Sequence, residues 1–481
     1  LLLRANSTVR QAVVRFLATN SHPDFYRYLQ VQLVDDNPAI REAVLETLIA
    51  MRQPLSTVQL MFLLEDPSLP VRSLAFIAAQ QSDRQNAEIQ AACEATWLSL
   101  TTPARPVGIT EATIESAQML VVQAIQESRN SQFIPLLQAL IATASDEVKR
   151  LGLNTLAVLA TPNDYSLATL AIFELESDTA AIRAAALNLL RVVQIDLFLQ
   201  SIAAMLNDSH PQVRQQAIAT IVAYGEACLP VVQPLLNSEH LETEKAAIAA
   251  ISQLQTRRAE TILFEHFQPL YAELARTLHW ARQLPPTPAW ETIMIALRDD
   301  HNQILQRVIY VLSCLEQDRN LTSLASLLTA SDRLIRLRAV ETLASISRYR
   351  RFIQPILPLL EDRIRASENQ QTGPTELPLN MTKMLLLEMV DARYRWIRIT
   401  AIAHLKSHGI PLPLHLVHDP DPFVAKLATL TLSSLRSPTE ELNLSRIFFL
   451  KQISILQDLP LDDLLTINRT LKEQAFFANE L

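Results

Sequence analysis

The stretch Asp208-Ser209-His210-Pro211-Gln212-Val213-Arg214 decides the fold, because its pattern recurs along the chain. The pattern is an aspartate, often a proline, and then an apolar residue followed by arginine or lysine. It returns at residues 36–41, 66–72, 178–183 and 421–426. A repeat period of about 20 to 50 residues is the sequence signature of a solenoid. The basic residues of neighbouring copies are each 31 residues apart, from Arg10 to Arg41, Arg41 to Arg72, Arg183 to Arg214, and Arg214 to Lys245.

Each copy is predicted to form two helices. Residues 182–193 place apolar side chains at positions i, i+3, i+4, i+7, i+8 and i+11, which is the stripe of a helix that faces a core. The other helix of a pair, such as 198–206 or 231–236, is shorter. Neither helix can bury its stripe alone, so neighbouring pairs must stack. The sequence therefore predicts an all-α fold, an α-solenoid of antiparallel helix pairs.

Acidic residues are expected at the starts of the second helices. We expect Asp178 to cap the helix at 182–193, and Asp66-Pro67 and Asp421-Pro422 to supply a capping carboxylate followed by proline at the first helical position. The arginine of each copy can reach an aspartate of its own or the adjacent unit, which would form a ladder of ion pairs along the array. We interpret these arginines as structural and not as catalytic. The predicted ladder residues are Asp36, Arg41, Asp66, Arg72, Asp178, Arg183, Asp208 and Arg214.

Composition excludes several other classes. The 481 residues include only 5 glycines, far fewer than phosphate-binding loops, Rossmann domains or all-β folds normally need. The net charge of −8 provides no general electrostatic surface for nucleic acid. The three cysteines, Cys93, Cys228 and Cys314, are far apart without metal-ligand spacing, and indicate a reduced, cytoplasmic protein. No uncharged apolar run is long enough to span a bilayer.

The recurring aspartate, proline, apolar and arginine pattern, with two helices per unit, resembles HEAT repeats, particularly the short bacterial type, over residues 3–435. The resemblance implies a HEAT/armadillo-like superhelix with repeats at 1–100, 111–258, 301–365 and 381–436. Three stretches break the period. They are predicted as a linker at 101–110, an irregular helical segment with a proline-rich turn at 259–300, and an exposed loop at 366–380.

Residues 440–481 change character. The stretch 459–464, Leu-Pro-Leu-Asp-Asp-Leu, and the aromatic stretch 476–480 are similar to the start of cyclic-nucleotide-binding domains. The alternative is a further helical pair that caps the array. The family's nucleotide-binding residues would lie beyond Leu481, so no cofactor or small-molecule site is expected in this chain.

The combination of HEAT repeats and such a domain also resembles the soluble tail of ATP/ADP-translocase-type carriers. Membrane contact would then come only from a preceding segment. Because the chain begins with Leu1 rather than Met, we expect it to be part of a longer protein.

Two further groups of residues are candidate sites. His404 and His408 share a predicted helix face near His415 and His418, but helix-end capping explains them better than a metal site, and no metal is expected. The segment 333–398 carries twelve Lys and Arg against seven Asp and Glu, interleaved with aromatic residues. The expected partner-surface residues in it are Arg348, Arg350, Arg351, Arg393 and Arg395.

The leading hypothesis is a non-catalytic scaffold that binds a protein partner, as a cytoplasmic regulatory part of a larger protein. Short HEAT-like repeats also occur in phycobilin lyases, so a bilin-handling protein is one alternative. Nucleic-acid binding through 333–398 is another, and the acidic net charge disfavours it.

Overall fold

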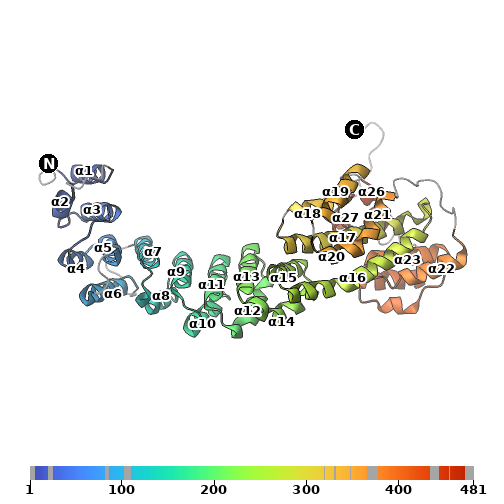
Figure 1. Ribbon diagram of the computed structural model, residues 1–481, viewed down its shortest axis with the longest axis horizontal. Coiled ribbons are helices and arrows are strands. Elements are labelled where there is room, and N and C mark those ends of the chain that lie inside the picture. Colours follow the sequence, from blue (N-terminus) through green and yellow to red (C-terminus); the bar gives the residue numbers. More distant parts are fainter. Residues whose placement is uncertain are drawn as a thin grey trace. The chain divides into compact units, whose positions relative to one another are not determined.

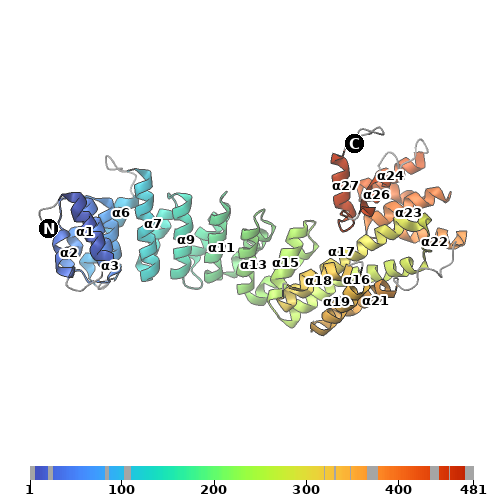
Figure 2. The same cartoon turned by 90° about the horizontal axis from the view of Figure 1, so that it is seen from above.

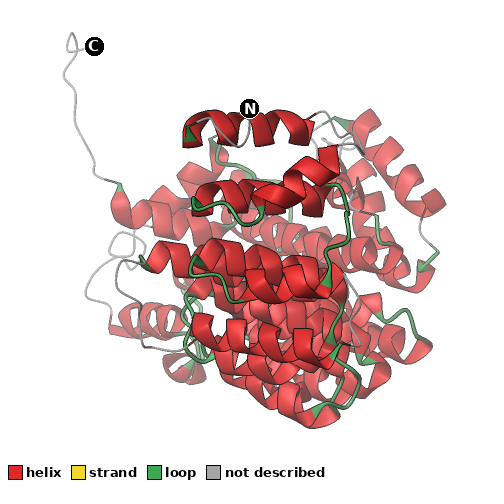
Figure 3. Cartoon of the chain, turned by 90° about the vertical axis from the view of Figure 1, so that its left-hand side faces the viewer, coloured by secondary structure: helices red, strands yellow, loops and turns green. Residues whose placement is uncertain are grey.

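The computed structural model describes residues 6–19, 25–81, 86–101, 110–318, 320–329, 332–346, 348–365, 377–433, 444–453 and 455–471. Across these ranges the chain forms helices joined by turns, and no strand is present (Figure 3). The chain divides into two compact units, Leu1–Ala250 and Ile251–Leu481. The prediction of an all-α solenoid is confirmed. Within the described residues, no helix is both long enough and apolar enough to cross a membrane.

In the first unit, one helix of each pair packs on its counterpart in the next pair. These stacked helices follow one another in chain order (Figures 1 and 2). They are α1 (Ser7–Thr19), α3 (Pro38–Ala50), α5 (Leu69–Gln81), α7 (Glu111–Ser128), α9 (Asp146–Leu159), α11 (Ala180–Val193) and α13 (Pro211–Ala223).

The other helix of each pair is shorter in most units, as expected. Some of these helices begin or end in a 3-10 turn, η2 (Ser131–Phe133) through η6 (Gln233–Asn237). The α-helices are α2 (Tyr26–Gln32), α4 (Thr57–Leu64), α6 (Ala87–Thr101), α8 (Ile134–Ile141), α10 (Tyr165–Glu174), α12 (Leu199–Ala204) and α14 (Leu229–Val232), and α15 (Leu241–Gln253) spans the division between the units.

The apolar stripe predicted for 182–193 is the buried face of α11. All six of its members are at most 4% exposed, and α11 packs between α9 and α13. A fully buried aliphatic side chain contributes about 1.5–3 kcal/mol relative to an exposed one. The stripe therefore binds each unit to its neighbours on both sides.

Only some of the predicted capping interactions are present at the starts of the helices. Asp421 accepts hydrogen bonds from the backbone N–H groups of Phe423 and Val424, and α24 (Pro422–Ser433) begins with the proline as expected. Asp178 does not cap α11, whose N-cap residue is Thr179, and the Thr179 side chain makes no capping hydrogen bond to the helix. Pro67 lies outside α5, which begins at Leu69. The Asp66 carboxylate accepts instead from the Ser68 N–H and from the Arg41 guanidinium of the preceding pair.

The second unit is built on two long helices, α16 (Arg257–Gln283) and α17 (Glu291–Glu316). The expected proline-rich turn lies between them, with η7 at Pro288–Trp290. The segment 259–300 is not irregular, and its predicted boundary at residue 300 falls inside α17. α17 carries charged residues on its buried face, near its middle. An amphipathic surface helix carries such residues on its exposed face, so the sequence pattern did not indicate one continuous helix here.

The remaining helices of this unit are shorter. Of the predicted linker and loop, residues 102–109 and 366–376 lie outside the described ranges. The helices are α18 (Asn320–Thr329), α19 (Arg333–Ile346), α20 (Arg350–Ile353), η8 (Gln354–Ile356), α21 (Leu357–Arg365), α22 (Leu379–Met389), α23 (Arg395–Ser407), η9 (Leu414–His418), α24, α26 (Leu444–Gln452) and α27 (Leu461–Thr470).

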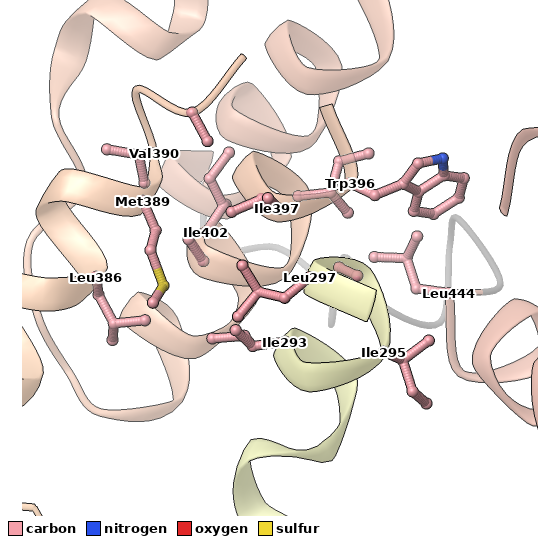
Figure 4. Close-up of a cluster of buried hydrophobic side chains, with 14 of the residues drawn as sticks. Ile293, Ile295, Leu297, Leu386, Met389, Val390, Trp396, Ile397, Ile402 and Leu444 are labelled. Atoms are coloured by element: carbon pink, nitrogen blue, oxygen red, sulfur yellow. The ribbon is translucent and has the colours of Figure 1, made fainter. Parts of the chain in front are cut away.

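Residues from α17, α22, α23, α24, α26 and α27 share one apolar cluster. Figure 4 shows Leu297 of α17 among Met389 and Ile402, and Leu444 beside Trp396. The described part of 440–481 is thus a helical pair packed on the preceding helices. The aromatic stretch 476–480 lies outside the described residues, so the likeness to a cyclic-nucleotide-binding domain stays a prediction.

Gly152 allows α9 to approach α8 closely. A Cβ atom at this position would lie 3.0 Å from Ile141 Cγ1. Inserting larger side chains into a packed core costs about 1–3 kcal/mol. We expect Gly152→Val to lower the free energy of unfolding of the first unit by at least this amount, measured by urea denaturation. Val158→Ile, at a position 43% exposed on the same helix, is the control and should change it by less than about 0.5 kcal/mol. Equal effects would contradict close packing here.

Candidate functional site

The repeat arginines join successive units. Arg41 Nε and Nη2 donate to the two carboxylate oxygens of Asp66, both at 2.7 Å. Arg183 donates to Asp208 in the same way, at 2.7 and 2.9 Å. In both cases the aspartate lies 25 residues further along, in the next pair. Two parallel bonds to an ionised carboxylate are among the stronger hydrogen bonds in proteins.

The same arginines also bind their own loop. Arg41 Nη1 donates to the carbonyl oxygens of Asp35 and Asp36, and Arg183 Nη1 donates to those of Ser177 and Asp178. Asp36 and Asp178 therefore contribute backbone carbonyls to the ladder, whereas the expected contribution was their carboxylates. One guanidinium thus fixes the turn within its unit and the distance to the following unit.

Two ladder arginines deviate. Arg72 binds the carbonyls of Asp66 and Pro67, while its Nε is buried without an acceptor, and burial lowers the pKa of its guanidinium. Arg214 pairs with Glu242 at 3.2 Å, and that glutamate side chain is 59% exposed. By contrast, the side chains of Arg183 and Asp208 are only 12% and 7% exposed. Burial alone would raise the pKa of Asp208, but its bonds from Arg183 and the His210 N–H lower it below the usual range.

Removing one partner of the buried pair should destabilise the junction between α11 and α13. Arg183→Met leaves the Asp208 carboxylate with little solvent and no guanidinium, so we expect a loss of about 2–4 kcal/mol. The measurement is hydrogen exchange of the α11 and α13 amides in the full chain. The matched control is Arg214→Met, whose exposed partner predicts a loss below about 1 kcal/mol. Indistinguishable losses would contradict a structural role for the buried pair.

A cavity of about 430 Å³ opens in the first unit, and we call it the α3–α5–α7 pocket. It takes residues from the C-terminal turns of these three helices and from the loop after α3. Buried Leu48, Leu55 and Ala124 form apolar parts of its wall. The remaining lining residues are Ile49, Arg52, Gln53, Pro54, Ile77, Ala78, Gln80, Gln81, Glu127 and Ser128. Its size is in the range of ligand-binding pockets.

The second unit contains a buried ionic centre on α17. Asp299 is 3% exposed and accepts from Lys451 Nζ at 2.7 Å, Tyr394 Oη at 2.6 Å and the Leu461 N–H at 3.1 Å. These donors come from α26, the start of α23 and the start of α27. A buried carboxylate is tolerated because each oxygen has donors. Asp299 therefore ties the C-terminal helical pair to α17.

The neighbouring Asp300 is the opposite case. It is 7% exposed, and its Oδ2 has no hydrogen-bond partner. Burial raises its pKa to about 7, with further increases from Glu273 and Asp299, while Arg393 and Arg307 oppose the shift. The nearby Glu273 of α16 pairs with Arg276 and accepts from the Arg393 N–H. Asp300 is thus a buried acid that folding favours in its protonated form.

Asp300 should make the second unit less stable as pH rises. The pKa of the Asp300 carboxyl is about 3.8 in the unfolded chain and about 7 in the folded one. The free energy of unfolding therefore falls as the pH rises from about 4 to about 7. We expect Asp300→Asn to raise the free energy of unfolding by up to about 4 kcal/mol at pH 8 and by less than half of that at pH 5. Urea denaturation at both pH values measures this. Glu341→Gln, at an exposed position on α19, is the control. A gain that does not depend on pH would contradict the mechanism.

Of the histidine group, His404 and His408 lie together, with ring centroids 6.2 Å apart, and both stack on Trp290. His404 stacks on Trp290 with ring centroids 5.2 Å apart, its Nε2 lies 2.9 Å from Thr292 Oγ1, and burial lowers its pKa to about 4. His415 lies beside Asp391. In the part of the chain that the structure describes, no group of three or more His, Cys, Asp or Glu side chains could hold a metal.

The predicted basic surface is split between two places. Arg351 pairs with Glu260 of α16 at 2.9 Å, and the Arg393 N–H donates to Glu273, thirteen residues along the same helix. At 1.5 Å per residue these points are about 20 Å apart. Arg395 is engaged by Asp462 and Asp421.

Near Arg351, Arg348 lies over Tyr349 and pairs with Glu316, and Arg350 is exposed. The five arginines therefore do not form one patch.

Comparison with known proteins gives a family-model match for part of the chain. Residues 1–80 and 199–279 match the family model of HEAT repeats. These two segments are therefore similar to HEAT repeats. No curated protein gives a significant match. Among solved structures, an engineered protein is similar at 13% identity and a TM-score of 0.31, covering 85% of this chain and 97% of that one. Importin beta is similar at 12% identity and a TM-score of 0.38, covering 96% of this chain and 59% of that one.

Two features were missed from the sequence. The α3–α5–α7 pocket brings together helix ends from residues 48–128, and no local pattern marks it. The ionic centre had a signal, because Asp299 and Asp300 interrupt the apolar run of α17. A predicted helix through 291–316 would have placed both carboxylates on a buried face.

Proposed function

We propose that this chain is a non-catalytic HEAT-repeat scaffold that binds a protein partner through its first unit. The observation that carries the proposal is the α3–α5–α7 pocket, because it spans three successive stacked helices. A surface that draws its lining from several repeats suits an extended ligand, which is how repeat proteins generally present their binding surfaces.

The ladder supports the same role. A binding surface made of several units keeps its shape only if the distance between units is held. Arg41 bonds bidentately to Asp66, directly before α5, and so connects two of the helices that line the pocket. Preorganisation of this kind reduces the entropy lost on binding.

The free cysteines favour a reducing compartment for this scaffold. Cys93, Cys228 and Cys314 are all unpaired, and burial raises the pKa of the Cys93 and Cys228 thiols to about 12 and about 11. Such thiols are inert. We therefore propose a cytoplasmic protein, and a regulatory part of a larger chain remains our prediction for its context.

The test is affinity capture with the full chain, followed by reconstitution with each purified captured protein. Ala78 is half-buried in the pocket lining. The substitution Ala78→Trp should fill the pocket and lower the affinity for a true partner at least tenfold. Val58→Trp, at a position 79% exposed on α4, is the matched control and should leave affinity unchanged. A failure to form any stoichiometric complex would contradict the scaffold role. A partner insensitive to Ala78→Trp would exclude this pocket as its site.

A further inference from the structure

The ion-pair ladder of the first unit leaves one arginine without a carboxylate. Arg10, Arg41 and Arg183 each pair with the aspartate 25 residues further along the chain, at 2.7 to 2.9 Å. Within the residues that the structure describes, Arg72 has no such ion pair, and the residue 25 positions after it is Trp97 of α6. The carboxylate that joins one unit to the next elsewhere is therefore missing at the junction that follows α5.

The guanidinium of Arg72 is nevertheless held as its counterparts are held. Its Nη1 donates to the carbonyl oxygens six and five residues earlier, those of Asp66 at 2.7 Å and Pro67 at 3.4 Å. Nη1 of Arg41 donates at the same two offsets, at 2.6 and 3.3 Å, and Nη1 of Arg183 at 2.8 and 3.0 Å. In these two arginines, the edge formed by Nε and Nη2 binds the aspartate. The same edge of Arg72 is thus oriented for a carboxylate in advance.

The free edge of Arg72 is costly in the isolated chain. Both of its hydrogen bonds to carbonyls use Nη1, whereas Nε is buried without an acceptor. Asp66 is close, but both of its carboxylate oxygens already accept from Arg41. Burial lowers the pKa of the Arg72 guanidinium although Asp66 opposes this shift. A charge that has lost solvent without gaining a partner destabilises the protein, so an added carboxylate would be favourable here.

The segment that supplies the acceptor in other units cannot supply it at this junction. Asp66 and Asp208 stand three residues before the first residues of α5 and α13. The corresponding position before α7 is Gly108, which has no side chain, and the sequence 102–109 contains no aspartate or glutamate. The half-buried Arg72 can still be approached from solvent.

The occupied copies of this site indicate the chemistry of the ligand. Arg41 and Arg183 hold aspartate side chains through two parallel hydrogen bonds. The planar guanidinium matches the two oxygens of a carboxylate in this geometry. The ligand that best reproduces these contacts at Arg72 is the side chain of an aspartate or a glutamate.

We propose that Arg72, in the first turn of α5, binds an aspartate or glutamate side chain of a polypeptide partner. The partner's carboxylate takes the place that Asp66 has beside Arg41. This inference rests on the proposed role of the first unit as a scaffold. It does not depend on the α3–α5–α7 pocket, which the C-terminal half of α5 lines.

The probe is a displayed library of random heptapeptides selected against the full chain. We expect the selected peptides to share aspartate or glutamate at one position. Replacing that residue by its amide should lower the affinity of the best peptide at least about tenfold, because a hydrogen-bonded charge pair is lost. Arg72→Gln should cause a similar loss. Arg27→Gln, which removes an exposed charge from α2, is the matched control and should change the affinity less than about twofold.

A double-mutant cycle separates direct contact from an effect on the fold. Arg72→Gln should weaken the amide form of the peptide less than about twofold, because the two groups act as a pair. Arg72→Lys keeps the charge but not the two-donor edge, and should lower the affinity for the acidic peptide at least about threefold. This second variant serves if Arg72→Gln does not fold, which melting temperatures report.

Three results would overturn the inference and leave the proposed function standing. The first is additive losses in the cycle, which would mean that Arg72 acts only through the local fold. The second is a loss of stability in the free chain on Arg72→Gln as large as that on Arg183→Met, because a carboxylate of the chain itself would then occupy Arg72. The third is a set of peptides without a shared acid that lose binding on Ala78→Trp. If no peptide is enriched and no partner forms a complex, the proposed function fails together with the inference.

Discussion

The first unit depends on burial of aliphatic side chains between helices that cannot be stable alone. The stacked helices from α3 to α11 have neighbours on both sides and bury residues between them, as α11 does with Ile182, Leu189 and Val193. An isolated helix of 13 or 14 residues is marginal in water. Stability is therefore a property of the stack, and each added unit contributes through the surface that it shares with its neighbours.

Aliphatic contacts hold units together without fixing their register precisely, because they are not directional. The ion-pair ladder fixes the orientation of one unit relative to the next. A guanidinium that binds two carbonyls of its own loop and a carboxylate 25 residues later permits only one arrangement of the two units. Where the acceptor is the exposed Glu242, the constraint is weaker. The first unit thus combines a non-specific cohesive force with specific links at defined positions.

The interior of the second unit contains two adjacent buried carboxylates. Its two long helices bring charged residues into the interior, and the structure satisfies Asp299 fully while leaving one oxygen of Asp300 without a bond. The satisfied carboxylate attaches α26 and α27 to α17. The unsatisfied carboxylate costs stability at neutral pH, and titratable groups with such shifted pKa values also occur at functional sites. Burial and hydrogen bonding, and not residue type, separate these two adjacent aspartates.

The 31-residue period determined the fold class, because a repeated pattern of core and polar positions can be satisfied only by repeated units that stack. It also identified Arg41 and Arg183 as structural residues, since their spacing matches the repeat. Only the tertiary structure decided which atoms they bind. Asp36 and Asp178 offer carbonyls because their carboxylates are not the ones that face the guanidinium. The pocket at the ends of α3, α5 and α7 and the contacts of Asp299 join residues up to 162 positions apart, so no local pattern could contain them.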